Sequence, residues 1–331
     1  GFSLPRGILR FAQNDEVCYF RGSIMTAMAS IARPQLWRRE LRLVLKGIIF
    51  SSPWLLGFIF FTIYPVGASF YYSLTRYDVL RPPKFVWFEN YVDLFTHDPL
   101  FTIVIKNTLF MVIVGVPVAL VVAFLLASLL NNDIRFRPIF RTIFFVPSIV
   151  PAVAIAMVWL WIYNTQWGMI NSFLASQGLR VIPFLSDPAL AKPSLIIINC
   201  WAQGGSIVIF LAALQDVPRT LYEAALVDGA TAFRRFWHVT IPMCTPSILF
   251  VLITDLIGTF QSFTLPWLLT EGGPNSATEL YGLYLYRNAF RFFKMGYASA
   301  LAWILFLVIV AFTIMVFRSS ARWVYYGGQV E

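Results

Sequence analysis

Three polar side chains interrupt an apolar stretch of the sequence at a regular spacing. Asn199, Gln203 and Ser206 stand at i, i+4 and i+7, which places them on one face of a helix. Amides and hydroxyls both donate and accept hydrogen bonds, so such a face could bind the hydroxyl groups of a sugar. The same side chains also join neighbouring helices inside a membrane. The spacing by itself leaves both uses open.

A second polar group follows in the next long apolar stretch. Phe260, Gln261 and Thr264 add an aromatic ring to an amide and a hydroxyl, and a flat apolar ring suits the face of a sugar ring. A polar side chain within lipid needs a partner and therefore faces the interior of a bundle or a cavity. We predict that the two groups line a substrate pathway.

Asp255 lies inside the same apolar stretch as Phe260. An ionisable residue in a membrane segment is a candidate functional group by default, here a proton or ion site. It can equally be a hydrogen-bonded structural residue beside a water-filled cavity. The first interpretation leads to an alternative function, a secondary transporter that protons drive through Asp255.

Chemistry of other kinds finds no support in the sequence. The two histidines, His97 and His238, are far apart, and the three cysteines form no CxxC pair, so neither a metal site nor a disulfide framework is indicated. The sequence has no phosphate-binding GxxxxGKS/T loop and no GxSxG nucleophile motif. We therefore expect no catalytic residue, no metal and no cofactor on this chain, which would not be an enzyme.

The composition indicates that a bilayer surrounds much of the chain. Hydrophobic residues make up 59% of it and charged residues 12%, whereas soluble domains carry about 25% charged residues. The net charge of +9 could suggest nucleic-acid binding, but Lys and Arg also gather on the cytoplasmic face of membrane proteins. Because the sequence is so apolar, we favour the second interpretation and expect no nucleic-acid partner.

Six stretches are long and apolar enough to cross a membrane as helices, since a span needs about 20 apolar residues. They lie at approximately 48–72, 107–130, 139–163, 194–214, 246–270 and 297–317. We therefore predict an all-α integral membrane protein with six transmembrane helices.

The basic cluster at 38–46, just before the first span, predicts a cytoplasmic N-terminus. An even number of spans then places the C-terminus on the same side. The predicted organisation is a cytoplasmic tail at 1–46, of which 1–24 could be unstructured, a transmembrane domain at 47–320 and a second cytoplasmic tail at 321–331. The external connections would hold short helices and turns at about 73–106, 164–193 and 271–296.

The one long cytoplasmic connection, 215–245, is punctuated like a pair of short helices. Asp216 and Pro218 suit a helix start, and Gly229 supplies a stop because glycine accepts the left-handed conformation. A second helical run follows at once and is predicted to end before Pro242. The pattern fits a surface on which a partner docks, and it fits an amphipathic connector equally well.

The residues EAALVDGATAFRRFWHVTIP at 223–242 resemble the EAA motif in permease subunits of bacterial ATP-binding-cassette importers. Glu223, Gly229 and Pro242 occupy fixed positions of that motif, and the departures are mild, a Val for an Ile and an Ile for a Leu. Other segments are similar to the carbohydrate-uptake branch of the family, which includes the maltose-type F subunit; they lie at 87–95, 140–164, 168–171 and 268–290.

This resemblance implies the six-helix fold of a type I importer permease in the bacterial inner membrane, moving a sugar or oligosaccharide by alternating access. It also implies partners: a second, homologous permease subunit, two ATPase subunits that carry ATP and Mg, and an extracytoplasmic solute-binding protein. The residues that would contact an ATPase subunit are Glu223, Ala224, Ala225, Asp228, Gly229 and Ala230.

The resemblance also bears on the substrate pathway. In maltose-type relatives, polar residues at similar places in the fourth and fifth spans line the sugar site, which favours Asn199, Gln203, Phe260 and Gln261. The charge of the sugar stays open. Arg287, Arg291 and Lys294, close together before the last span, would suit an acidic saccharide if they lined the entrance, and contacts with lipid or with a loop are the other interpretation.

Overall fold

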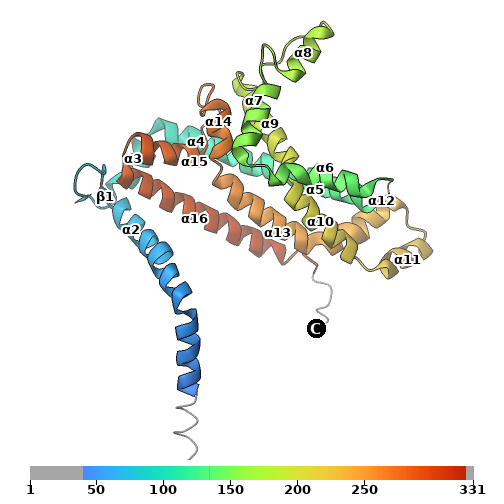
Figure 1. Cartoon of the computed structure of the whole chain (residues 1–331), viewed down its shortest axis with the longest axis horizontal. Coiled ribbons are helices and arrows are strands. Elements are labelled where there is room, and N and C mark those ends of the chain that lie inside the picture. The colour runs from blue at the N-terminus through green and yellow to red at the C-terminus, as the bar shows by residue number, and fades with distance from the viewer. Residues whose placement is uncertain (1–39, 134, 326–331) are drawn as a thin grey trace, which may run out of the picture. The chain divides into compact units, whose positions relative to one another are not determined.

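Apolar helices make up most of the chain that the computed structural model describes, residues 40–133 and 135–325 (Figure 1). Within these residues, four helices are long and apolar enough to cross a membrane: Glu40–Ser73, Pro99–Asn131, Ala232–Phe260 and Met295–Ser320, the last labelled α16. Two bent pairs of helices would each form one further span. Counted in this way, the spans number up to six, which confirms the predicted all-α membrane fold. The predicted tail at 1–24 lies outside the described residues.

Contacts between residues divide the chain into two units, 1–68 and 69–331. The described part of the first unit is helical and includes η1 (Ile59–Ile63) and the beginning of α2 (Tyr64–Ser73). The π-helical turn of η1 lets the helix pass Pro65, which has no N–H to donate. All the sites described below belong to the second unit.

The second span consists of α4 (Pro99–Phe110), the π-helical η2 (Met111–Gly115) and α5 (Val116–Asn131). It begins before the predicted start at 107, because Asp98 caps it by accepting hydrogen bonds from two backbone N–H groups of the first turn. Pro99 at the first helical position is also favourable, since that position needs no donor. The cap, rather than the apolar run, fixes where this span begins.

A bend of 105° separates α6 (Arg137–Ile149) from α7 (Ala152–Ile162). Val150, between them, has an extended backbone because the ring of Pro151 disfavours a helical conformation in the preceding residue. The stretch predicted as one span, 139–163, therefore consists of two helices with a sharp bend between them.

A bend of 50° separates α9 (Pro188–Trp201) from α10 (Gly204–Asp216). Gly204 begins α10 in close contact with α6: a Cβ on it would lie 2.7 Å from Phe144 O and 2.9 Å from Phe145 O. Only a glycine allows the two backbones to approach so closely. Gln203 lies at the break between the two helices.

The fifth span begins inside the predicted coupling segment. It comprises α12 (Ala232–Arg235), η3 (Phe236–Thr240) and α13 (Ile241–Phe260), and these run without interruption. The prediction of a separate short helix that ends before Pro242 was wrong. In η3 the Ile241 N–H donates to Phe236 O in a π-helical bond, and this wider turn lets the helix continue through the proline.

The remaining connections contain short elements. They are the antiparallel strands β1 (Thr75–Arg76) and β2 (Lys84–Phe85), and the helices α3 (Glu89–Thr96), α8 (Met169–Ser176), α14 (Thr264–Thr270), α15 (Tyr281–Tyr286) and η4 (Arg287–Arg291). All except α14 are the short helices and turns that the sequence predicts at 73–106, 164–193 and 271–296, with a small hairpin in addition. The helix α14 lies instead at the end of the stretch predicted as the fifth span, 246–270, because α13 ends at Phe260.

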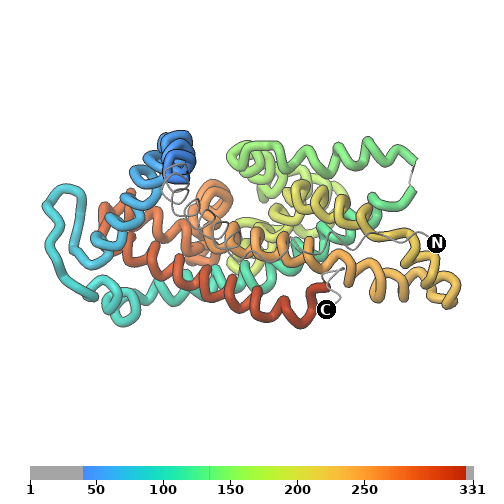
Figure 2. Tube along the Cα trace, turned by 90° about the horizontal axis from the view of Figure 1, so that it is seen from below, coloured from blue at the N-terminus to red at the C-terminus, as the bar shows by residue number. Residues whose placement is uncertain are grey.

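Three clusters of buried apolar side chains hold the second unit together. The first lies between α4, α13, α15 and α16 and includes Phe101 and Leu301. The second lies between α5, α10 and α13 and includes Phe210. The third includes Ile155 of α7 and Ile198 of α9. Figure 2 shows α16 running beside α13, and these two helices contact each other.

Candidate functional site

The connection after α10 forms one short exposed helix, α11 (Arg219–Val227). Its start differs from the prediction, because Asp216 is the last residue of α10 and does not begin the new helix. Val217 is extended, as the residue before a proline tends to be, and Pro218 occupies the cap position of α11. The chain therefore changes direction at the proline and not before it.

Gly229 ends α11, as the sequence predicts. Its φ of +72° is left-handed. The Gly229 N–H donates to Leu226 O at 3.0 Å and the Ala230 N–H donates to Ala225 O at 2.8 Å, which is the hydrogen-bond pattern of a Schellman turn. No atom lies within 4 Å of a Cβ built on Gly229. The backbone conformation, and not crowding, is therefore what requires glycine here.

The residues predicted to couple to a partner lie together on an accessible surface. No residue of α11 is buried. Glu223, Ala224, Asp228 and Gly229 are exposed, and Ala225 and Ala230 are partly buried. The neighbouring Val227 is 88% exposed. An exposed apolar side chain beside small residues suits close approach by another protein.

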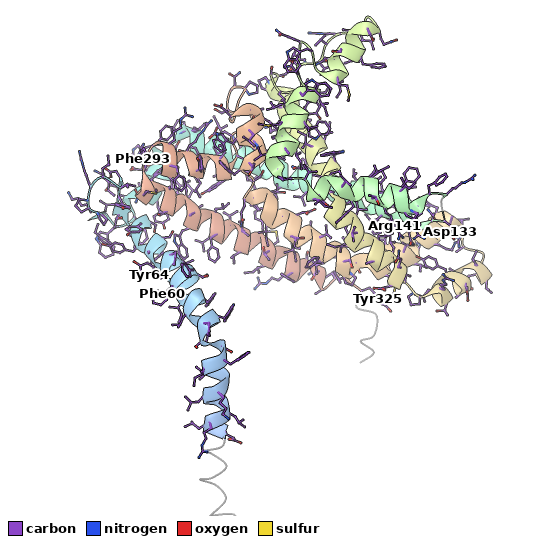
Figure 3. All side chains as sticks on the ribbon, viewed as in Figure 1. Phe60, Tyr64, Asp133, Arg141, Phe293 and Tyr325 are labelled. Atoms are coloured by element: carbon purple, nitrogen blue, oxygen red, sulfur yellow. The ribbon has the colours of Figure 1, made fainter. Side chains whose placement is uncertain are left out.

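A contact through Tyr222 joins α11 to the fifth span, and a second contact joins the end of the described chain to the same span. The Tyr222 hydroxyl lies 3.0 Å from Thr240 Oγ1 in η3, and the Tyr222 ring packs against the cluster between α5, α10 and α13. Tyr325, near the end of the described chain (Figure 3), donates its N–H to Thr245 Oγ1 at 2.8 Å. A displacement of α11 would therefore act directly on the helix that contains α13.

A polar cavity of about 180 Å³ lies between η2, α5, the break between α9 and α10, and α13. Its polar lining residues are Asn199, Gln203, Thr254, Asp255, Thr259 and Ser262. Gln203 Nε2 donates to Asp255 Oδ2 at 3.3 Å, so the carboxylate has a hydrogen-bond partner within the cavity. We call this space the central cavity.

The structure brings together part of the predicted substrate group. Asn199 and Gln203 both line the central cavity. Ser206 instead lines an adjoining cavity of about 260 Å³ that also contains Gln203. The prediction that all three share one helix face was wrong, because the 50° bend between α9 and α10 interrupts that face at Gln203.

The second predicted group lies outside the central cavity. Phe260 is 2% exposed and packs edge to face on Phe312, with ring centroids 5.2 Å apart. Gln261 is exposed at the end of α13, and Thr264 begins α14. The Phe260 ring therefore fills the core of this chain and presents no free face to the cavity.

Sequence reasoning missed Thr254, Thr259 and Ser262. Asp255, Thr259 and Ser262 stand at i, i+4 and i+7, the spacing that selected the group around Gln203. Applying the same test to the fifth span would have found Thr259 and Ser262, whereas Thr254 does not fit this spacing.

The basic residues before the last span do not act as a group. Arg287 Nη1 lies 2.6 Å from the carboxylate of Glu279, and Arg287 Nη2 donates to Glu271 O at 2.5 Å. Glu279 is 1% exposed; burial raises the pKa of its carboxyl, and the charge of Arg287 opposes that shift. Arg287 is thus a partner of its own loop. Arg291 is exposed, and Lys294 lines a separate, larger cavity.

Residues 115–325 match the model of a protein family described as the binding-protein-dependent transport system inner membrane component. The chain belongs to this family. The matched residues contain α11, every lining residue of the central cavity except Met111, and five of the long or bent helices, in whole or in part. The chain is therefore a multi-pass component of a transport system in the inner membrane.

Two similar proteins align with this chain over most of its length. A probable ABC transporter permease protein of Bacillus subtilis (strain 168), YesP, is 39% identical over 87% of the chain and 94% of the relative. The lactose transport system permease protein LacF of Rhizobium radiobacter is 34% identical over 83% and 94%.

A solved structure shows the same fold. It is a chain of a bacterial ABC transporter involved in the import of the acidic polysaccharide alginate, which superimposes with a TM-score of 0.75. The similarity covers 87% of this chain and 99% of that chain at 24% identity. The architecture is thus that of an ABC importer permease.

Proposed function

We propose that this chain is one of two permease subunits in an ATP-driven importer that moves a sugar or oligosaccharide across the bacterial inner membrane. The similarity to a lactose permease supports the substrate class. The neutral amides and hydroxyls of the central cavity are suited to sugar hydroxyls. The proton-driven alternative finds no support in a family whose members work with binding proteins.

The coupling mechanism follows from the position of one long helix. The helix Ala232–Phe260 begins three residues after Gly229, beside α11, and carries Asp255 and Thr259 into the central cavity. A rigid helix transmits a displacement along its length, whereas a flexible loop would absorb it. Closure of an ATPase dimer on α11 would in this way open and close the pathway at the cavity.

Each of the predicted residues has a role in such an importer. Glu223, Ala224, Ala225, Asp228, Gly229 and Ala230 contact an ATPase subunit, which holds ATP and Mg. Asn199 and Gln203 bind the sugar together with the missed polar residues of α13. Ser206, Gln261 and Thr264 lie further along the pathway, and Phe260 supports its wall from the core.

The importer also requires a defined orientation of this chain in the membrane and further protein partners. Because of the basic cluster at 38–46, both termini and α11 lie on the cytoplasmic side. A second permease subunit completes the pathway, because one chain with up to six spans encloses only part of it. A solute-binding protein delivers the sugar on the other face, to the end of the helices opposite α11.

Uptake by the whole complex in proteoliposomes tests the proposal. We expect uptake of lactose or an acidic oligosaccharide to require ATP, the ATPase subunits and the binding protein, and to persist when a protonophore collapses the proton gradient. Gln203→Ala should reduce uptake about tenfold, since a lost hydrogen bond in a buried site costs about 1–2 kcal/mol. Uptake that needs the proton gradient and not ATP would overturn the proposal of an ATP-driven importer.

A further inference from the structure

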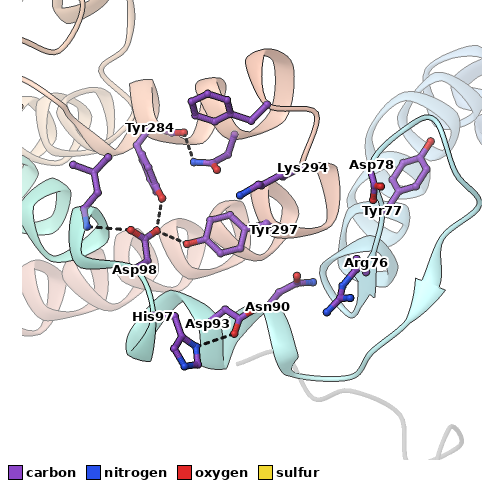
Figure 4. A pocket seen from close by; sticks show the side chains of 13 residues that line it. Arg76, Tyr77, Asp78, Asn90, Asp93, His97, Asp98, Tyr284, Lys294 and Tyr297 are labelled. Atoms are coloured by element: carbon purple, nitrogen blue, oxygen red, sulfur yellow. Dashed lines mark hydrogen bonds and ion pairs between the residues drawn. The ribbon is translucent and has the colours of Figure 1, made fainter.

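A second and larger cavity lies at the end of the second unit opposite α11. It measures about 810 Å³, within the range of about 300–1,000 Å³ that is usual for small-molecule sites. The corner between α3 and α4, the strand β1 and the corner between η4 and α16 enclose it (Figure 4). None of its lining residues lines the central cavity. We call it the outer cavity.

Asp98 fixes the wall of the outer cavity and has no bonding capacity to spare. Its Oδ1 accepts from Leu100 N at 3.0 Å and from Phe101 N at 3.2 Å. Its Oδ2 accepts from the hydroxyls of Tyr284 and Tyr297, which both point at it in Figure 4. This carboxylate therefore ties α4 to α15 and α16 and is not a ligand.

The two amides that line the cavity are held by their nitrogen atoms. Asn90 Nδ2 donates to two backbone carbonyls, at 2.8 and 2.9 Å. Asn288 Nδ2 donates to Tyr284 O at 3.0 Å. Asn90 and Asn288 are 8% and 3% exposed as whole residues, and neither side-chain oxygen accepts a hydrogen bond from the described residues. Each oxygen is thus held in place as an acceptor.

The charged side chains add both acceptors and donors to the lining. Asp78 makes no ion pair with the described residues, and Asp93 is engaged through one oxygen, by His97 at 3.1 Å. Arg76 already pairs with Glu89. Lys294 Nζ, which points into the cavity in Figure 4, has no carboxylate within 4.0 Å among the residues described.

We infer that the outer cavity is a second saccharide site, which takes a neutral oligosaccharide before it enters the pathway. The lining offers the oxygens of Asn90, Asn288, Asp78 and Asp93 as acceptors and the N–H groups of Arg76 and Lys294 as donors, so a ligand that both donates and accepts hydrogen bonds fits it, as hydroxyl groups do. The carboxylates of Asp78 and Asp93 disfavour a phosphate. Lys294 supplies a donor for hydroxyl oxygens, and the rings of Tyr77 and Phe292 supply apolar surface. The inference rests on the proposed function, because a sugar must be the cargo.

Protection of Lys294 from an amine-reactive label, read by mass spectrometry, tests the site in the whole transporter in nanodiscs. The probes are lactose, maltotriose, cellotriose, xylotriose and raffinose, each at about 10 mM. A site with a dissociation constant of about 1 mM would then be about nine-tenths full, and labelling should slow about tenfold. Inorganic phosphate at the same concentration should have no effect. Lys106, which does not line the cavity, is the control for general effects on reactivity.

Substitutions in the two cavities should have different effects on the protection of Lys294 and on uptake. Asn288→Ala and Asp78→Ala should each abolish protection of Lys294, whereas Gln203→Ala should preserve it while uptake falls. No protection by any of the sugars would overturn the inference. Protection by phosphate, or by anionic lipid in the nanodisc without any sugar, would also overturn it and assign the cavity to a lipid headgroup. Failure of ATP-driven uptake with intact protection would count against the proposed function instead.

Discussion

Gly229 combines a left-handed backbone with open surroundings, so its substitution separates backbone strain from steric crowding. A side chain in this conformation costs about 1–2 kcal/mol, except for Asn, which tolerates it. We expect Gly229→Val and Gly229→Trp to reduce ATP-driven uptake about tenfold or more, since 1.4 kcal/mol is a factor of ten. Gly229→Asn should retain most uptake. Membrane insertion should be normal in all three.

Gly178 provides the matched control for this prediction. It has a φ of +70° and nothing within 4 Å of a built Cβ, but it follows α8, far from α11 in the sequence. Gly178→Val should carry a similar backbone cost and leave the ratio of sugar transported to ATP hydrolysed unchanged. If both glycines gave the same loss of that ratio, the coupling role of Gly229 would be wrong.

The buried ion pair of Glu279 and Arg287 leads to a second prediction, which concerns the stability of the protein. Removal of one partner from a buried ion pair costs about 3–5 kcal/mol, because the other charge is left without compensation. We expect Arg287→Met to lower the Tm of the purified transporter, and the exposed Arg291→Met to have little effect. Glu279→Gln combined with Arg287→Met should recover much of the loss.

The pH dependence of the Arg287→Met variant follows from the same pair. Burial raises the folded-state pKa of Glu279, and Arg287 no longer opposes that shift. Below the unfolded pKa the carboxyl is neutral in both states and no penalty arises. As pH rises the folded state must bury an unpaired charge or keep a proton, so the destabilisation should be larger at about pH 8 than at about pH 5. An equal loss at both values would contradict this account.

At the scale of helices, the bend between α9 and α10 depends on one close approach. Gly204 contacts the backbone of α6, whereas a Cβ on the adjacent Gly205 meets nothing within 4 Å. We expect Gly204→Ala to destabilise the protein by about 1–3 kcal/mol, as overpacking does, and to impair uptake by moving Gln203 away from Asp255. Gly205→Ala should be neutral or slightly stabilising, because alanine is the better helix former. Thermal unfolding and uptake measure the two effects.

At the scale of the whole molecule, the question is what drives transport. In an ATP-driven importer, Asp255→Asn keeps the shape of the central cavity and a hydrogen bond with Gln203. Uptake should then change by no more than about fivefold, the effect of about 1 kcal/mol, and it should still require ATP. Abolished uptake in this variant, together with sensitivity to a protonophore in the native protein, would instead favour the proton-driven mechanism.

Local patterns in the sequence predicted the membrane fold and the turn at Gly229 that ends α11. Hydropathy over about 20 residues decides whether a helix can lie in lipid, so the membrane-spanning stretches follow from the chain itself. The glycine at the end of α11 is also a local requirement, because its backbone angle alone demands it. The residues of that exposed surface were named from the resemblance to the EAA motif, since the helix punctuation alone fits an amphipathic connector equally well.

The cavity and its exact lining depended on contacts that no local pattern encodes. The bend at Gln203 arises where Gly204 meets α6, and it removed Ser206 from the face that the spacing predicted. The packing of Phe260 on Phe312 and the pairing of Arg287 with Glu279 likewise join separate elements of the chain. A helix period gives the direction of a side chain relative to its own helix, and only the packed neighbours determine whether that direction leads into a core, an ion pair or a cavity.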